Sequence, residues 1–292
     1  MGKVCVVGLG YIGLPTAAML ASCGHEVIGC DVDESVVRGI NEGHPHFNEP
    51  DLQMLLSAAV QTGRLKAQQS PVDADYYILA VPTPFCDGKK PDLSYVNDAT
   101  DSVAPLLRNG STVILESTSP VGTTERLAER LAAARPDLSF PRYKQADVEV
   151  DIHIAHCPER ILPGQMVREL VSNDRIIGGL TEACAQSALT LYESFVKAEA
   201  FMTDSRTAEL VKLIENSYRD VNIAFANELS VICDELGVDV WQAIALANKH
   251  PRVNILKPGA GCRRTLHRHR PLVRCRCSSQ NRASDPHGAG SE

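Results

Sequence analysis

A glycine loop set between two short apolar segments constrains the fold of this chain more than any other feature. Residues 4–7 are typical of a buried strand, and Gly8-Leu9-Gly10-Tyr11-Ile12-Gly13 follows them at once. An amphipathic stretch continues to about Cys23, and residues 26–31 are typical of a second strand that ends in an acidic residue. This order of strand, glycine loop, helix and strand predicts a βαβ unit that binds a dinucleotide.

Each glycine of the loop has its own role in such a unit. Gly8 permits a tight turn, Gly10 lets the backbone approach a pyrophosphate, and Gly13 lets the helix pack closely on the strand. Free N–H groups at the helix N-terminus attract the phosphates. Asp31 lies 18 residues beyond Gly13, where its carboxylate accepts both ribose hydroxyls and repels a 2′-phosphate. The sequence therefore favours NAD over NADP, with a purely structural glycine turn as the alternative.

Two further strands are followed by loops rich in hydroxyl groups. Residues 76–81 precede Pro82-Thr83-Pro84, and residues 112–116 precede a loop that runs from Ser117 to Thr124. Ligands of open α/β sheets bind at the carboxyl ends of strands, so both loops are candidate ligand loops. Thr124 lies near the start of the next helix, where it is expected either to cap that helix or to contact a cofactor.

The middle of the chain predicts more units of the same kind. We expect strands at residues 152–156 and 175–179, a polar loop over residues 134–148, and a helix from about Glu182 to Val196. The first half of the chain is therefore predicted to be a Rossmann-like, doubly wound parallel sheet.

Composition limits the class of protein. A chain of 292 residues suggests about two domains, and a net charge of −7 argues against nucleic-acid binding. No apolar run approaches the ~20 residues of a membrane span, and the glycine loop begins too early for a secretory signal. The body's cysteines are scattered without paired spacing, which predicts buried, reduced thiols in a cytoplasmic protein.

From about Ser205 to Leu236 the chain has helical periodicity with no Pro or Gly. Its apolar side chains share one broad face: Leu210, Leu213, Ile214, Val221, Ala224, Phe225, Leu229 and Ile232. Lys212, Asn216 and Arg219 recur at i, i+4 and i+7 and so share one side of the helix. We expect this polar set to be functional, and the helix to join two domains or to pack against a copy of itself.

Several short sequence motifs occur along the chain in a fixed order. They are the glycine loop, Val81-Pro82-Thr83-Pro84, Glu116-Ser117-Thr118, Cys157-Pro158-Glu159-Arg160, Glu209-x-x-Lys212-x-x-x-Asn216, and residues 250–256. As a set they resemble the UDP-glucose/GDP-mannose dehydrogenases, and the resemblance covers residues 1–261. Residues 159–164 and 216–229 are similar to the N-acetylmannosamine branch, and Pro163 stands where the glucose branch usually has a second glutamate.

The resemblance implies an NAD-dependent, four-electron oxidation. The C6 hydroxymethyl of a UDP-sugar, UDP-N-acetyl-D-mannosamine, becomes a carboxylate for polysaccharide precursor synthesis, and two NAD⁺ are reduced in turn. A cysteine traps the aldehyde and then forms a thioester, which divides a difficult step into easier ones. The intact family is also expected to form a homodimer through the long helix.

The resemblance also implies roles for individual residues. NAD would contact the three glycines together with Tyr11, Ile12, Asp31, Thr83 and Thr124. The nucleotide sugar would contact Arg160, Ile161, Lys212, Asn216, Arg219, His250 and Arg252. Lys212 is expected to act with Asn216 as a general acid/base that stabilises oxyanion charge, while Thr118 and Glu159 would position water and a proton. Arginines suit a diphosphate, and a structural role for His250 stays open.

The character of the sequence changes after Gly261. Residues 262–292 carry seven Arg and two acids, a net charge of +5 against −12 for residues 1–261. The family continues here with Val-Gly-Gly-His-Cys-Ile-Ala, which would place the nucleophilic cysteine at position 266, where this chain has Leu266. Codons for residues 262–277, read one base later, permit the family sequence throughout. We therefore hypothesise a single-base frameshift near Gly261.

The sequence thus predicts an NAD-binding domain at residues 1–200 and an all-α segment built on the long helix at 201–261. Residues 262–292 are expected to form an aberrant, disordered tail because they contain few side chains that can be buried. A metal site at His267-x-His269 and Cys275-x-Cys277 is not expected, because the spacing is irregular. The family's C-terminal nucleotide-sugar domain is expected to be absent.

Two alternatives to an impaired nucleotide-sugar dehydrogenase remain. One is a catalytically dead NAD-binding module with the same fold. The other is a two-electron dehydrogenase of the 3-hydroxyacid type, which shares a Lys/Asn pair and needs no cysteine. The blocks at residues 157–160 and 250–252 argue against the second alternative.

Overall fold

The computed structural model describes residues 1–84, 86, 90–145 and 149–259. Within these ranges one mixed sheet contains β1 (Lys3–Val7), β2 (Glu26–Cys30), β3 (Leu65–Gln68), β4 (Tyr76–Leu79), β5 (Thr112–Leu115), β6 (His153–His156), β7 (Arg175–Gly179) and β8 (Ala200–Asp204). The strand order is β3-β2-β1-β4-β5-β6-β7-β8. The chain therefore winds outward from β1 to β3 and then returns to the other side of β1, which is the doubly wound arrangement that the sequence predicts.

The sheet departs from the parallel pattern at one pair of strands. β6 and β7 run antiparallel, with Ala155 opposite Gly179, and β8 then pairs in parallel with β7. The sequence patterns do not predict β3 and β8, the two edge strands. Leu65–Gln68 alternates with polar residues instead of forming an apolar run, and β8 has no fully buried residue.

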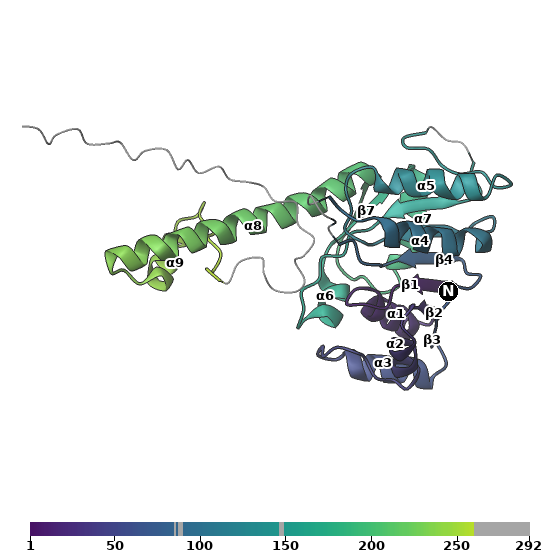
Figure 1. Cartoon of the computed structure of the whole chain (residues 1–292), viewed down its shortest axis with the longest axis horizontal. Coiled ribbons are helices and arrows are strands. Elements are labelled where there is room, and N and C mark those ends of the chain that lie inside the picture. Colours follow the sequence, from purple (N-terminus) through teal and green to yellow (C-terminus); the bar gives the residue numbers. More distant parts are fainter. Residues whose placement is uncertain (85, 87–89, 146–148, 260–292) are drawn as a thin grey trace, which may run out of the picture.

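The helices cover both faces of the sheet (Figure 1). They are α1 (Gly13–Ser22), α2 (Glu34–Asn41), α3 (Leu52–Gln61), α4 (Ser94–Val103), α5 (Thr123–Ala134), α6 (Met166–Ser172), α7 (Glu182–Tyr192), α8 (Ser205–Leu236) and α9 (Val240–Ala247). The predicted bounds of α8 are confirmed, whereas α7 ends four residues before the predicted Val196. Among the described residues, no helix combines the length and the apolar character that crossing a bilayer requires.

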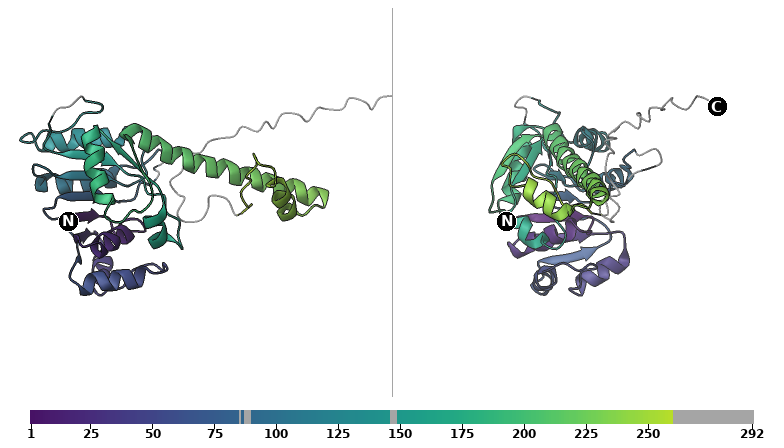
Figure 2. Two further views of the ribbon diagram at one scale, coloured as in Figure 1. Left: turned by 180° about the vertical axis from the view of Figure 1, so that it is seen from behind. Right: turned by 90° about the vertical axis from the view of Figure 1, so that its left-hand side faces the viewer.

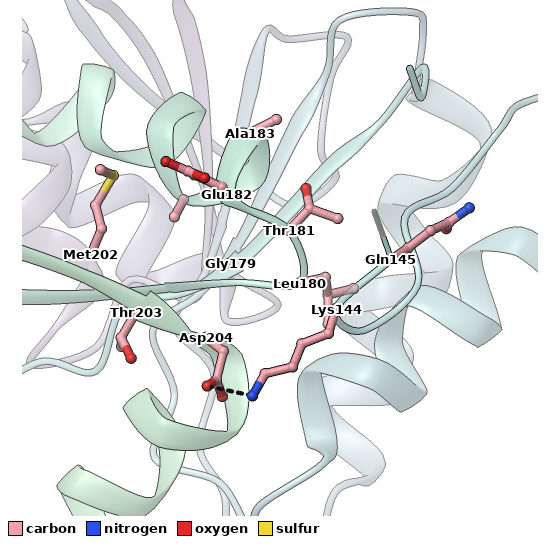
Figure 3. A pocket seen from close by; sticks show the side chains of 11 residues that line it. Lys144, Gln145, Gly179, Leu180, Thr181, Glu182, Ala183, Met202, Thr203 and Asp204 are labelled. Atoms are coloured by element: carbon pink, nitrogen blue, oxygen red, sulfur yellow. Dashed lines mark ion pairs between the residues drawn. The ribbon is translucent and has the colours of Figure 1, made fainter. Parts of the chain in front are cut away.

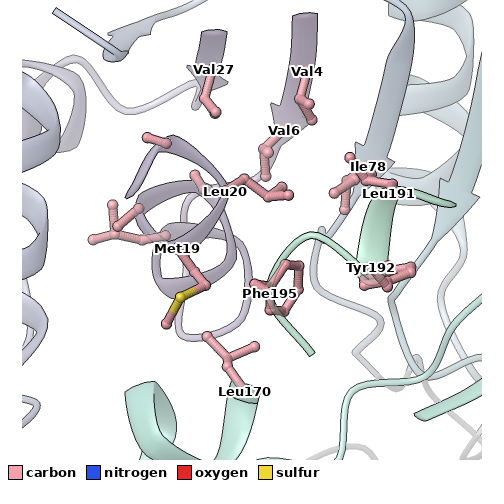
Figure 4. Packing of buried hydrophobic residues seen from close by; sticks show 14 of the residues in the cluster. Val4, Val6, Met19, Leu20, Val27, Ile78, Leu170, Leu191, Tyr192 and Phe195 are labelled. Atoms are coloured by element: carbon pink, nitrogen blue, oxygen red, sulfur yellow. The ribbon is translucent and has the colours of Figure 1, made fainter. Parts of the chain in front are cut away.

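Alternate strand residues build two cores. Val4, Val6 and Ile78 face α1 and α7 on one side of the sheet, together with Leu20 and Tyr192 (Figure 4). On the other side, the neighbouring strand positions pack against α4 and α5; they are Cys5, Tyr77, Leu79, Val113 and Leu115. Full burial of one such large apolar side chain stabilises the fold by about 1.5–3 kcal/mol. Strands that are buried on both faces give the continuous apolar runs seen in the sequence.

The first turn of α8 lies directly on β7. A Cβ atom on Gly178 would stand 2.5 Å from Cβ of Ala208 and 2.6 Å from the carbonyl oxygen of Asp204. Asp204 caps the helix by accepting a 2.9 Å hydrogen bond from the backbone N–H of Thr207. From this seat α8 projects away from the sheet, and α9 folds back on its far end (Figures 1 and 2).

Much of the projecting part of α8 is apolar and exposed. Large apolar side chains with substantial exposure are Leu210, Ile214, Val221, Phe225, Val231, Ile232 and Leu236. Most of these belong to the apolar face that the sequence predicts. The sheet leaves this face uncovered because only the first turns of α8 lie against it.

The seat of α8 predicts a steric effect at Gly178. Gly178→Ala should lower the free energy of unfolding by about 1–3 kcal/mol, because the new methyl group meets backbone atoms of α8. Urea denaturation measures the change. Gly259→Ala is the matched control, since a Cβ at Gly259 meets no atom within 4 Å. Equal unfolding midpoints for the Gly178 variant and the unaltered chain would contradict this close approach.

Candidate functional site

The glycine loop joins β1 to α1 in a turn that two of its glycines make possible. Gly8 has a φ of +92°, and a Cβ there would lie 2.7 Å from the carbonyl oxygen of Ala80. A Cβ on Gly13 would lie 1.8 Å from the carbonyl oxygen of Gly8. A side chain at Gly8 would therefore push the loop away from the segment after β4, and a side chain at Gly13 would push α1 away from the loop.

Gly10 is different, because no contact with other protein atoms requires a glycine at this position. A Cβ on Gly10 would meet no atom within 4 Å, so the absence of a side chain leaves open space at the start of α1. Such space suits a phosphate that approaches the helix N-terminus. Asp31 lies beside this loop, and its carboxylate accepts a 3.0 Å hydrogen bond from the backbone N–H of Leu9. The loop, the helix and the acid thus fit a dinucleotide, as the sequence predicts.

The ring of Tyr11, a residue of this loop, is exposed and packs against a second aromatic ring. Its centroid lies 4.4 Å from that of Phe47, in the segment between α2 and α3. The sequence analysis predicts Tyr11 and Ile12 as NAD contacts but does not identify Phe47. An aromatic residue in a connecting segment carries no periodic signal that would reveal such a contact.

The loops after β4 and β5 are tied to each other. The hydroxyl of Thr83 donates to the carbonyl oxygen of Thr118 at 2.7 Å, and the hydroxyl of Ser117 donates to the carbonyl oxygen of Val81 at 2.7 Å. Both loops lie at carboxyl ends of strands. Because β1 and β4 are neighbours whose connections leave in opposite directions, this edge is the place where open α/β sheets bind their ligands.

Thr124 does not cap α5. Gly122 occupies the N-cap position, and Thr124 is a fully buried residue inside the first turn. Its hydroxyl donates a 2.7 Å hydrogen bond to Glu209 of α8. The capping interpretation of Thr124 is therefore wrong, because a carboxylate from another helix takes the place of a local cap. Glu209 belongs to a motif of the sequence, but its spacing gives no sign of this contact.

Glu159 shapes the loop that follows β6. One carboxylate oxygen accepts the backbone N–H groups of Arg160 at 2.6 Å and Ile161 at 3.0 Å, and the other accepts from Arg175 at 2.6 Å. The side chains of Glu159 and Arg175 are each only 3% exposed. This buried ion pair holds the turn that presents Arg160 and Ile161. It is the carboxylate that the sequence analysis expected to position water.

Lys212 lies on α8 opposite this turn. Its ammonium group donates a hydrogen bond to the backbone carbonyl oxygen of Glu159. Burial lowers the pKa of Lys212, while the nearby carboxylates of Glu215 and Glu159 act in the opposite direction. A lysine whose ammonium form is disfavoured transfers protons more readily near neutral pH, which suits a general acid/base.

Glu215, Asn216 and Arg219, which lie near Lys212 on α8, have side-chain partners. Arg160 forms a 2.8 Å ion pair with Glu215, and Arg219 donates to the side-chain oxygen of Asn216 at 2.8 Å. The structure thus brings Lys212, Arg160 and Ile161 together beside the Asn216–Arg219 side of α8. This grouping agrees with the shared side that the spacing predicts.

A buried acid lies beneath the site. Burial, together with the neighbouring Glu159, raises the pKa of Glu116 to about 7, and the hydroxyl of Tyr192 donates to it at 2.7 Å. Burial also raises the pKa of Cys157 to about 12, so its thiol stays protonated. Cys157 therefore cannot serve as a thiolate nucleophile.

Arg175, the buried partner of Glu159, is not predicted from the sequence, because an arginine at the end of a strand is usually a surface residue.

His250 and Arg252 are not brought to the group around Lys212. Both are exposed, in the segment that follows α9. That segment is held at the distal part of α8, where the backbone N–H of Gly259 donates to Asn227 at 2.9 Å. Asn227 lies about 22 Å along the helix from Lys212 at 1.5 Å per residue. Within this chain the predicted substrate residues thus fall into two separate sets.

Some predictions lie outside the described residues. These include the expected nucleophile at position 266, the tail and the rejected metal cluster. Of the seven cysteines in the described part, Cys86 is exposed, which differs from the prediction of buried thiols.

A surface hollow of about 550 Å³ lies at the β8 edge of the sheet (Figure 3). It opens between β8 and the start of α7, with Lys144 paired to Asp204 at 3.4 Å on one side. None of the predicted site residues lines this hollow. The glycine loop and Lys212 therefore define the candidate site, and this hollow is separate from it.

Comparison with known proteins gives consistent results. Residues 2–196 match the profile of the UDP-glucose/GDP-mannose dehydrogenase family, NAD binding domain, and residues 206–263 match the family's central domain. An NDP-N-acetyl-D-galactosaminuronic acid dehydrogenase of Ralstonia nicotianae is 60% identical over 88% of this chain and 60% of its own length. A UDP-N-acetyl-D-mannosamine dehydrogenase of Campylobacter jejuni is 58% identical over 89% of this chain and 63% of its own.

A solved UDP-D-ManNAc dehydrogenase from Pyrococcus horikoshii superposes with a TM-score of 0.81 at 44% identity. The match covers 88% of this chain and 60% of that one. The chain therefore spans about 60% of the length of the curated relatives that it matches.

The raised pKa of Glu116 predicts a pH-dependent stability. Its folded-state pKa of about 7 exceeds the ordinary 4.5, so the stability associated with its neutral form is fully present below about pH 4.5. That stability is lost as the pH rises through 7. Relative to the unaltered chain, Glu116→Gln should gain about 3 kcal/mol between pH 4.5 and pH 8.

Chemical denaturation across this pH range measures the difference between the two proteins. Glu235→Gln, which alters an exposed carboxyl of α8, is the matched control. A difference that stays constant from pH 4.5 to pH 8 would show that Glu116 titrates normally.

Proposed function

Because this chain belongs to the UDP-glucose/GDP-mannose dehydrogenase family, we propose that it carries the NAD site and part of the substrate site of an enzyme that oxidises UDP-N-acetyl-D-mannosamine to the uronic acid. The single observation that carries this proposal is that the same chain combines open space at Gly10 with a lysine, Lys212, that is bonded to the loop after β6. A cofactor site and an acid/base group are two of the components that such an oxidation needs, and the nucleophilic cysteine is the third.

NAD, when bound, supplies the acceptor for a hydride from the sugar alcohol. In this proposal Gly10 and the start of α1 hold the pyrophosphate, and Asp31 accepts the ribose hydroxyls. Tyr11, Ile12 and Thr83 are proposed to contact NAD as well. Thr124 is proposed to act through the α5 terminus, because its hydroxyl is bonded to Glu209.

On the substrate side, Lys212 is proposed to take the proton of the C6 hydroxyl and to stabilise the oxyanion. Asn216 would assist it, while Thr118 and Glu159 complete the water and proton path. Arg160, Ile161 and Arg219 would hold the nucleotide sugar. The relatives that support this proposal are named for two sugars, so UDP-N-acetyl-D-galactosamine is the competing substrate.

The proposal includes a shifted reading frame after Gly261. The similarity to the curated relatives extends over 258–260 residues, which supports this part of the proposal. With Leu266 in place of the cysteine, the chain is proposed to bind NAD but to be inactive or impaired in turnover. A division near residue 200, between a dinucleotide domain and a helical segment, belongs to the same proposal.

A second copy of this chain is proposed to pack on α8 and form a homodimer. The protein is proposed to act in the cytoplasm. The exposed apolar side chains of Val221 and Phe225 support such packing, because large apolar patches tend to be covered by partners. The separation of His250 and Arg252 from Lys212 also supports it, since another subunit offers a way to complete the substrate site.

Gly10 provides a test of the NAD site that does not perturb the fold. Gly10→Ala should weaken NAD binding by about tenfold or more, because the methyl group enters the space proposed for the pyrophosphate. Isothermal titration calorimetry measures the affinity. The melting temperature should not change, since no protein atom lies within 4 Å of the new Cβ. Unaltered NAD affinity would place the dinucleotide elsewhere.

The turnover proposal is tested by following NADH at 340 nm with UDP-N-acetyl-D-mannosamine, UDP-N-acetyl-D-galactosamine and 3-hydroxyacids as separate substrates. The chain with Leu266 should bind NAD without appreciable turnover. The protein encoded by a gene whose reading frame is shifted by one base after codon 261 should form NADH with UDP-N-acetyl-D-mannosamine. Rapid turnover by the chain with Leu266 would refute the proposed loss of the nucleophile. NADH formed only from 3-hydroxyacids would favour the two-electron alternative.

A further inference from the structure

Glu209 is a fully buried carboxylate on α8, one helical turn before Lys212. We propose that Glu209 is a positioning residue that fixes Lys212 relative to the cofactor-side loop after β5. The inference rests on the proposed function, because it assigns to Glu209 the placement of the acid/base group of that same site.

The carboxylate closes the N-terminus of α5. One oxygen accepts the backbone N–H of Gly122 at 2.6 Å, and the other accepts both the backbone N–H and the hydroxyl of Thr124, at 2.8 Å and 2.7 Å. Three donors thus converge on one side chain that comes from a different helix. A carboxylate with this many donors at a helix N-terminus is held in a single orientation.

The local electrostatics favour this arrangement over a conventional ion pair. Burial raises the pKa of Glu209, and the hydrogen bonds from Thr124 and Gly122 oppose that rise. The positive end of the α5 macrodipole and its free N–H groups therefore compensate the buried charge. A second connection between the same helices, from Arg206 to Glu125 at 2.6 Å, is more exposed and contributes less.

The position of Glu209 along α8 links this contact to the site. Glu209, Lys212 and Asn216 follow one another at i, i+3 and i+7 and so lie on one stripe of the helix. The first residue binds the loop after β5, and Lys212 binds the carbonyl oxygen of Glu159 in the loop after β6. Two successive turns of α8 are therefore fixed to two neighbouring strand-end loops. Loss of the first contact leaves the second without its support on the cofactor side.

The experiment compares Glu209→Gln with the unaltered full chain. An amide nitrogen in place of one carboxylate oxygen faces a backbone donor, so one of the three bonds is lost. Amide hydrogen exchange at Gly122 and Thr124 should accelerate by about tenfold or more. The pH profile for chemical labelling of the Lys212 amine should shift upward, because the side chain becomes more exposed to water. Glu228→Gln, which removes an exposed charge from the same helix, should change neither measurement.

Normal exchange at Gly122 and Thr124 together with an unchanged labelling profile for Lys212 would overturn the inference. Accelerated exchange with an unchanged profile for Lys212 would also overturn it, because Glu209 would then serve α5 alone. If Glu209→Gln does not fold, Thr124→Val removes a single bond and should produce smaller changes in the same directions. Thr124→Ser retains the hydroxyl and should restore both measurements, and failure of this rescue counts against the inference.

These measurements do not depend on turnover. A chain that forms no NADH, or binds no NAD, still reports whether Glu209 places Lys212. Conversely, an active chain whose Lys212 ignores Glu209 would retain the proposed function and lose only this inference.

Discussion

The seat of α8 on the ends of β5, β6 and β7 is the contact on which the rest of the site depends. Gly178 brings the helix within van der Waals distance of the sheet, because it has no side chain to separate Ala208 from β7. Glu209 then meets the start of α5, and Lys212 meets the turn at Glu159. Parallel strands deliver their loops to one edge of the sheet, so a single helix laid across that edge contacts several of them in succession.

Beneath this seat the protein buries charge where a purely apolar core would be expected. Glu159 and Arg175 form an ion pair that water scarcely reaches, and Glu116 lies close by as a carboxyl that is easily protonated. Removing one partner of such a pair is costly, commonly about 3–5 kcal/mol, because the other charge stays buried. The pair also gives the Arg160–Ile161 turn a fixed shape.

Local sequence patterns predicted the elements whose causes are local. The glycine loop, β1 and α1 follow from glycine sterics, and the bounds of α8 follow from an unbroken period between Asp204 and Gly237. Contacts between distant segments could not be predicted in this way. Thr124 looks like a cap because the sequence does not reveal that Glu209, 85 residues later, supplies the carboxylate. Likewise, the spacing of His250 gives no indication that α9 turns back at the distal part of α8.

α8 also acts as a lever. Its far end lies about 40 Å beyond Glu209, so a tilt of about 5° at the seat displaces that end by about 3.5 Å. A small change in the tilt of α8 at the sheet therefore causes a larger displacement of α9 and of the segment after it. The hydrogen bonds of Glu209 near the sheet therefore affect the position of α9 and of the segment after it. The far end of α8 does not pack against the sheet, so no other contact with the sheet fixes that position.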